Sequence, residues 1–377
     1  MALKDILLAA SIGTTMIGTN TEAKETVAPP ITPQQMQTLS PAEIQEMNFQ
    51  KNYRHLYKNV DGAWFSFGDE KKMRQTLYDI GSFAMGREII ANIPENMEFG
   101  SSNFMPSKII GGFDLADNSL NMNTNYIDGY TFDTTGTLID LRGILFHELL
   151  HAYQKKQGIA LVDDHASIDE LLHAQKLIEA ETAAWNKVLN TTTQLSSTNS
   201  YFLRPEEVRD LMHRDLVAEE RKEWEDIGMK KDFNTRQEAH FKKTDSRYLL
   251  QQALIACNGN YDLAQKKLVA EEMKNLMNST VSEWHNNYNK QALTVIATLC
   301  VSKKISEHGN PTAYKKMLNY YKKTYGLNPQ DIPNTQLATE HTDTIAKFKA
   351  EMKEYNLYSD SERRPDIRLA QQKRGGR

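Results

Sequence analysis

The pentapeptide His147-Glu148-Leu149-Leu150-His151 constrains this chain more than any other segment. The apolar residues around it have the spacing of a buried helix, at Leu141, Ile144, Leu145, Leu149 and Ala152. Polar side chains inside such a helix are costly unless they bind a partner. Residues four apart lie on the same helix face, so both imidazoles can point at one metal ion. The alternative is two buried or solvated histidines that are four apart by chance, and the apolar flanks argue against it.

The residue types in this pentapeptide suit zinc. Two neutral imidazoles can bind Zn²⁺ at about 2.0–2.1 Å. Glu148 follows the first histidine, so its carboxylate can reach a zinc-bound water and accept the proton of that water. Neither Cys257 nor Cys300 belongs to a pair with metal-ligand spacing, so the predicted site uses histidine and carboxylate. We therefore predict that His147 and His151 bind zinc and that Glu148 is the general base.

A catalytic zinc site needs a third protein ligand and an open position. The next predicted helix, residues 168–189, offers Glu179 and Glu181, which lie about 200° apart around a helix. Glu179 shares its face with polar residues and is expected to face solvent. Glu181 falls within a stripe of apolar residues, where a carboxylate needs a compensating cation. The members of this stripe are Leu171, Ala174, Ile178, Trp185 and Val188. The pattern favours Glu181 as the third ligand over Glu179.

The segments before this helix have mixed patterns. Residues 1–45 are expected to form an N-terminal segment and a flexible, proline-containing linker. Residues 69–93 have three-and-four apolar spacing, which predicts one helix that ends at Pro94. Residues 108–125 predict a β-hairpin whose second strand, 119–123, alternates between apolar and polar side chains. The helix with the paired histidines is expected to begin near Leu138.

The second half of the chain predicts helices almost throughout. Residues 191–200 are polar and predict a surface loop or a lid. Helices are expected at 205–226, 235–257, 261–286, 290–306 and 311–325. Residues 201–356 would then form a helical C-terminal region, and residues 357–377 a disordered basic tail. The predicted fold class is α+β, mostly α, with a small hairpin or sheet in residues 46–200.

The segment around the paired histidines resembles the glutamate-type zincin metallopeptidases, in particular bacterial putative and effector-type metallopeptidase domains. The resemblance covers about residues 53–190 and does not extend to the C-terminal helices. It is carried by the HExxH sequence at 147–151, by Glu181-Thr182-Ala183-Ala184, which is similar to an E-x-x-A third ligand, and by Gly86-Arg87 within a helical segment. The three-histidine class has the longer sequence HExxHxxGxxH. Tyr153-Gln154 follow His151-Ala152 in this chain, so the required glycine is absent and that class is excluded.

This resemblance implies a zincin-like domain at 46–200 that acts as a zinc metalloendopeptidase. Zinc would be held by His147, His151 and Glu181, with Glu148 as the base. In such enzymes a substrate peptide runs along a sheet edge, for which residues 119–123 are the candidate here; the alternative is that these residues belong to a plain solvent-exposed hairpin. A tyrosine or histidine usually helps to hold the oxyanion, and the candidates are Tyr153, Tyr201, His213 and His240.

Composition limits the partners. The formal net charge of −4 gives no general attraction to nucleic acid or to anionic membranes. The apolar run 6–18 is too short to span a bilayer, so no stable membrane insertion is expected, but the run resembles a signal-peptide core. Both a cytoplasmic and a secreted location stay open. The expected partner is a peptide or protein substrate. The alternative function is a non-catalytic interaction or effector scaffold with a structural or vestigial zinc site, and the intact Glu148 favours the enzyme.

Overall fold

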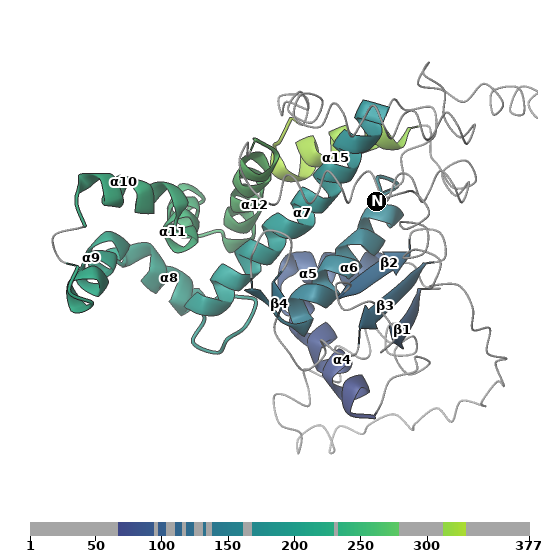
Figure 1. The fold of residues 1–377 in the computed structure, drawn as a ribbon, viewed down its shortest axis with the longest axis horizontal. Helices are drawn as coiled ribbons and strands as arrows, with labels where there is room; N and C mark the ends of the chain where they lie inside the picture. Colours follow the sequence, from purple (N-terminus) through teal and green to yellow (C-terminus); the bar gives the residue numbers. More distant parts are fainter. Residues whose placement is uncertain are drawn as a thin grey trace, which may run out of the picture.

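A computed structural model describes residues 67–93, 97–102, 110–114, 118–123, 131–132, 138–160, 168–229, 233–278 and 312–328. Helices dominate these ranges, and the strands form one small sheet and a short two-stranded ribbon (Figure 1). The predicted class, α+β and mostly α, is confirmed at this level. The N-terminal segment 1–45, the helix expected at 290–306 and the tail 357–377 lie outside the described ranges.

Two helices occupy the segment that was expected to form one. Helix α4 spans Phe67–Ile80 and helix α5 spans Ala84–Asn92, so the prediction of a single helix over 69–93 is wrong. A Cβ atom on Gly86 would lie 1.7 Å from the carbonyl oxygen of Ile80, so only glycine allows this close approach of α5 to the end of α4. The Arg87 guanidinium donates to the Ser82 carbonyl at 2.8 Å and so satisfies a backbone oxygen at the break.

The three-stranded sheet has the order β1-β3-β2. Its strands are β1 (Glu98–Ser102), β2 (Gly111–Asp114) and β3 (Ser119–Asn123). Strands β2 and β3 pair antiparallel, which confirms the predicted hairpin, whereas β1 pairs with β3 in parallel. The expectation that 119–123 is the sheet edge is therefore wrong, because β1 covers the other side of β3. Strand β2 is an edge strand of this sheet.

The helix that carries the histidine pair, α6, spans Leu141–Lys156. It begins later than expected because Leu138 and Ile139 form strand β5 (Leu138–Ile139), which pairs with β4 (Thr131–Phe132). The Asp140 side chain caps the helix by accepting a hydrogen bond from the Gly143 amide at 3.1 Å.

Helix α7 spans Ile168–Leu195 and is longer than predicted. The hydroxyls of Thr191, Thr192 and Thr193 donate to the carbonyls four residues earlier, at 2.9, 3.0 and 2.9 Å. Because these hydroxyls bond along the helix, the polar threonine run does not interrupt it. The expected loop or lid over 191–200 is therefore wrong for its first five residues, which are helical.

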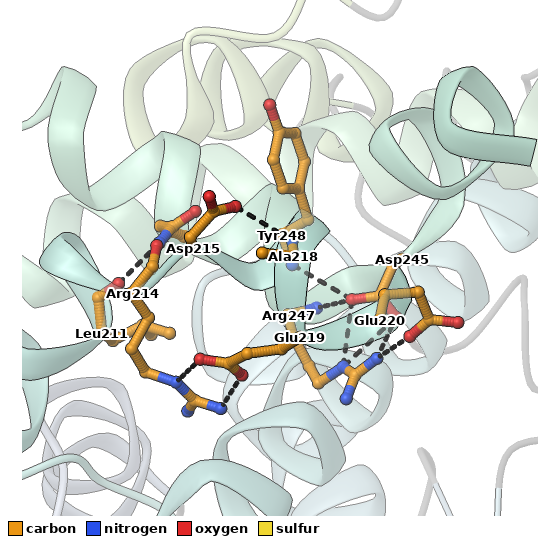
Figure 2. Close-up of polar contacts among 10 residues, drawn as sticks. Leu211, Arg214, Asp215, Ala218, Glu219, Glu220, Asp245, Arg247 and Tyr248 are labelled. Carbon is orange, nitrogen blue, oxygen red and sulfur yellow. Dashed lines mark hydrogen bonds and ion pairs between the residues drawn. The ribbon is translucent and has the colours of Figure 1, made fainter. Parts of the chain in front are cut away.

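The helices that follow are shorter and more numerous than predicted. They are α8 (Pro205–His213), α9 (Leu216–Asp226), α10 (Thr235–Thr244), α11 (Ser246–Ala256), α12 (Tyr261–Asn278) and α15 (Ala313–Tyr325). The expected helices 205–226 and 235–257 both break in two, because Asp215 and Asp245 each cap the N-terminus of a new helix. Figure 2 shows ion pairs beside the two breaks, Arg214 with Glu219 and Arg247 with Asp245. Helices α8 to α11 extend away from the sheet (Figure 1).

One hydrophobic core joins the sheet, α6, α7 and the later helices. Helices α12 and α15 lie beyond the expected domain boundary at residue 200, yet their buried residues, such as Met273 and Tyr321, belong to the same core as those of α6 and α7. Figure 1 shows α12 and α15 beside α7. Cys257 is a buried free thiol in this region. None of the described helices has both the length and the apolar composition to cross a membrane.

Candidate metal centre

Three potential ligand atoms meet between α6 and α7. The Nε2 atoms of His147 and His151 lie 3.1 Å apart. The two carboxylate oxygens of Glu179 lie 3.5 Å from His147 Nε2 and 3.6 Å from His151 Nε2. Among the described residues, these three side chains are the group of histidine, cysteine and carboxylate residues that could hold a metal ion. The structure thus brings together the two predicted histidines and a glutamate from the following helix.

The spacing of these atoms fits a zinc ion. Ligand atoms that bind zinc tetrahedrally at about 2.0–2.1 Å lie about 3.3–3.4 Å from one another. The two histidine nitrogens lie 3.1 Å apart, and each lies 3.5 or 3.6 Å from a different oxygen of Glu179, so a small shift of the carboxylate would bring one oxygen to that spacing from both nitrogens. Two imidazoles and one carboxylate are also the ligand set of one class of catalytic zinc site. His147, His151 and Glu179 are therefore the residues that would hold the metal, and the fourth position would stay open.

Charge at this centre favours a cation. Burial alone would lower the pKa of His151, but the adjacent Glu179 carboxylate outweighs burial and raises the pKa to about 9. Burial raises the pKa of Glu179, whereas His151 and His147 lower it more strongly and hold it far below its usual range. The carboxylate is therefore ionised, and positive charge between the three side chains is stabilised.

Glu181 was expected to be the third ligand, but it does not lie with the histidines, and the structure brings Glu179 to them instead. The Glu181 carboxylate is fully buried and accepts hydrogen bonds from Gln154, Tyr320 and Tyr325. The apolar stripe did not identify the ligand, because α7 is buried on nearly all sides and its polar face is not a solvent face. Lys176, one of the polar residues on the same face as Glu179, is only 2% exposed. The face that carries Glu179 is therefore turned toward α6 and not toward water.

Glu148 lies in the same pocket as the three candidate ligands. The pocket has a volume of about 220 Å³, and Gly111, Gly112 and Phe113 of strand β2 form part of its wall. Glu148 is 8% exposed, and its negative charge is one of the causes that raise the pKa of His151. Its carboxylate lines the pocket and can exchange a proton with a molecule there.

The four candidate oxyanion donors lie elsewhere, since none of them lines this pocket. The Tyr153 hydroxyl donates to Glu88 at 2.7 Å, and the Tyr201 hydroxyl lies 3.5 Å from Asp140. His213 and His240 belong to α8 and α10, in the part of the molecule that extends away from the sheet (Figure 1).

Sequence reasoning missed Gln154, which contacts the second ring nitrogen of His151. Gln154 Oε1 lies 2.8 Å from His151 Nδ1. Its position three residues after His151 on the same helix is the signal that could have identified it, because residues three apart are neighbours on a helix surface.

Comparison with known proteins adds no relative to these observations: no protein-family model matches the chain, and neither a curated protein nor a solved structure matches it.

Proposed function

We propose that this chain is a zinc-dependent metallopeptidase with a zincin-like site. His147, His151 and Glu179 hold the metal, and Glu148 is the general base. The observation that carries this proposal is the cluster of His147, His151 and Glu179, whose ligand atoms all lie within 4.8 Å of one another, with the Glu148 carboxylate lining the same pocket. A purely structural zinc site would have no use for that fourth polar group.

When bound, zinc supplies Lewis acidity toward a carbonyl oxygen and lowers the pKa of water in its open position. Glu148 accepts the proton of the attacking water as the water oxygen bonds to the carbonyl carbon of the peptide. Glu148 then delivers this proton to the amine nitrogen as the carbon–nitrogen bond breaks. Because Glu148 lines the pocket, its carboxylate is within reach of a bound peptide for both transfers.

An extended peptide is the substrate shape that the pocket favours. Strand β2 is an edge strand of the three-stranded sheet and forms part of the pocket wall. The free backbone groups of an edge strand can pair with an added peptide strand. This role was expected for residues 119–123, and the sheet order moves it to residues 111–114.

The test is Glu148→Gln, which is nearly isosteric and leaves the three proposed ligands in place. We expect the variant to bind zinc as the wild type does and to unfold at the same temperature. Its cleavage of a mixed peptide library should fall by about 10²–10⁴-fold, because an amide cannot accept the proton. Both proteins are compared at matched zinc content. Equal cleavage by the two proteins would contradict the role of Glu148.

The alternative is an interaction or effector scaffold in which the zinc site is structural or vestigial. It predicts bound zinc with no peptide cleavage by the wild type, against either the library or candidate partner proteins. It also predicts that Glu148→Gln leaves partner binding unchanged. The position of Glu148 in the pocket, beside the three proposed ligands, favours the enzyme over this alternative.

A further inference from the structure

The second ring nitrogen of His151 is held by a fully buried amide. His151 Nδ1 lies 2.8 Å from Gln154 Oε1, and Gln154 is 0% exposed. The amide nitrogen of Gln154 faces the opposite way, 3.3 Å from the carbonyl oxygen of Ile178 and 2.8 Å from a carboxylate oxygen of Glu181. Gln154 thus connects Glu181 to His151 across the interface between α6 and α7.

The chemistry of these groups decides where the protons lie. The Ile178 carbonyl can only accept, so the Gln154 end that faces it must be the NH₂ group. The oxygen of Gln154 then faces His151, and because a carbonyl oxygen only accepts, Nδ1 of His151 must carry a proton. When His151 is neutral, as a metal ligand must be, the proton stays on Nδ1 and the Nε2 lone pair points toward His147 and Glu179.

Two tyrosines of helix α15 form hydrogen bonds with Glu181, the residue that Gln154 connects to His151. The hydroxyls of Tyr320 and Tyr325 both donate to the same oxygen of Glu181, Tyr320 at 2.7 Å. The indole N–H of Trp185 donates to the Tyr325 hydroxyl at 2.8 Å, so the hydroxyl proton of Tyr325 is free to point at Glu181. Glu181 therefore accepts from three donors, and its position is fixed by residues about 140 positions later in the chain.

We propose that Gln154 and Glu181 are positioning residues for the metal centre. They hold His151 with the proton on Nδ1 and the Nε2 lone pair aimed at the ion, and the α15 tyrosines hold them in place. The metal part of this inference rests on the proposed function, whereas the hydrogen bond between His151 and Gln154 does not. Outer-shell partners of this kind usually contribute about 10–100-fold to metal affinity.

The hydrogen bond can be measured in the metal-free protein. With ¹⁵N-labelled histidine, the Nδ1 proton of His151 should give a separate, slowly exchanging NMR signal, because its acceptor is buried. His151→Asn identifies the signal by its loss. In Gln154→Met, which keeps the side-chain length without an acceptor, the proton should exchange at least tenfold faster or disappear from the spectrum. Gln265→Met replaces a buried glutamine of α12 and should leave the signal unchanged.

Zinc affinity is then measured by competition with a chelator. We expect Gln154→Met to raise the dissociation constant by about 10–100-fold and Gln265→Met to leave it unchanged. Glu181→Gln conserves side-chain size, and it should weaken zinc binding in the same direction even if Gln154→Met does not fold.

Three outcomes would overturn the inference: no slow Nδ1 signal in the wild type, a slow signal retained in Gln154→Met, or a lost signal with zinc affinity changed less than threefold. In each case normal zinc binding by the wild type would leave the proposed function intact. A wild type that binds no zinc overturns the proposed function and the metal part of this inference together. The Nδ1 signal then still shows whether Gln154 holds His151.

Discussion

Two glutamates on one helix, Glu179 and Glu181, are both buried, and their surroundings give them different tasks. Glu179 faces two imidazoles, which hold its pKa far below the usual range against the effect of burial. Burial raises the pKa of Glu181 more than the hydrogen bonds from Tyr325, Tyr320 and Gln154 lower it. The first environment suits a metal ligand, because the carboxylate stays ionised beside a cation. The second suits a fixed acceptor of hydrogen bonds.

The matched pair Glu179→Gln and Glu181→Gln separates these tasks. Loss of an outer-shell partner is expected to weaken zinc binding by about 10–100-fold. Glu179→Gln removes a charged ligand and should weaken zinc binding by more than this. Glu181→Gln should stay within that range. The dissociation constants of both variants are measured by chelator competition, with circular dichroism as the control for folding. A larger loss in Glu181→Gln than in Glu179→Gln would return the ligand role to Glu181.

At the scale of the elements, strand β2 offers a test of how a substrate enters. Gly111 and Gly112 both line the pocket, but their surroundings differ. A Cβ atom on Gly112 would meet nothing within 4 Å, whereas one on Gly111 would lie 3.2 Å from Met122 Sδ and 3.3 Å from Ile144 Cγ2. A side chain at 112 therefore enters open space at the pocket, and a side chain at 111 enters the packed core.

Gly112→Val should accordingly fold and bind zinc as the wild type does, but it should cleave peptides more slowly, because the new side chain projects from the sheet beside the pocket that Gly112 lines and crowds a peptide bound along β2. Gly111→Val should lower the free energy of unfolding by about 1–3 kcal/mol through overpacking. Chemical denaturation and peptide-library cleavage are measured on both variants. Wild-type cleavage by a well-folded Gly112→Val would show that substrates do not run along β2.

Helix α6 could be predicted from the sequence because its signal is local. The HExxH spacing fixes two histidines on one face, and the structure places His147, Glu148 and His151 in one pocket. The β-hairpin could be predicted for the same reason, since its apolar and polar residues alternate. The helix boundaries were predicted less accurately. Apolar periodicity alone predicts too early a start for α6 and continuous helices across residues 215 and 245. In the structure, new helices begin after the capping residues Asp140, Asp215 and Asp245.

Helix α7 shows why the third ligand could not be predicted. An apolar stripe identifies the buried face only when the other face meets water. In this fold α6 and the C-terminal helices surround α7, and even Asn186 on its polar side is 2% exposed. Which glutamate faces the histidines is then decided by packing between distant segments, which the spacing of residues within one helix does not encode.

At the scale of the whole molecule, the C-terminal helix α15 is part of the structure that surrounds the site. Its residues Tyr320 and Tyr325 reach Glu181, and Trp185 of α7 donates to Tyr325. The C-terminal region therefore contributes buried hydrogen bonds next to the proposed metal centre, and its role is not limited to covering a surface. We expect the stability of the folded chain to depend on these bonds.

Tyr325→Phe tests this dependence. The variant leaves the indole N–H of Trp185 without its acceptor and Glu181 with one donor fewer, and an unsatisfied buried polar group costs about 1–3 kcal/mol. Its free energy of unfolding should fall by that amount in urea denaturation. Tyr321→Phe is the matched comparison, because the Tyr321 hydroxyl also lies near Glu181 but makes none of the close hydrogen bonds that Tyr320 and Tyr325 make to it. Removing this weaker contact should lower the free energy of unfolding by less than Tyr325→Phe does. Equal losses in the two variants would mean that packing of the rings, rather than the bond to Glu181, ties α15 to the metal centre.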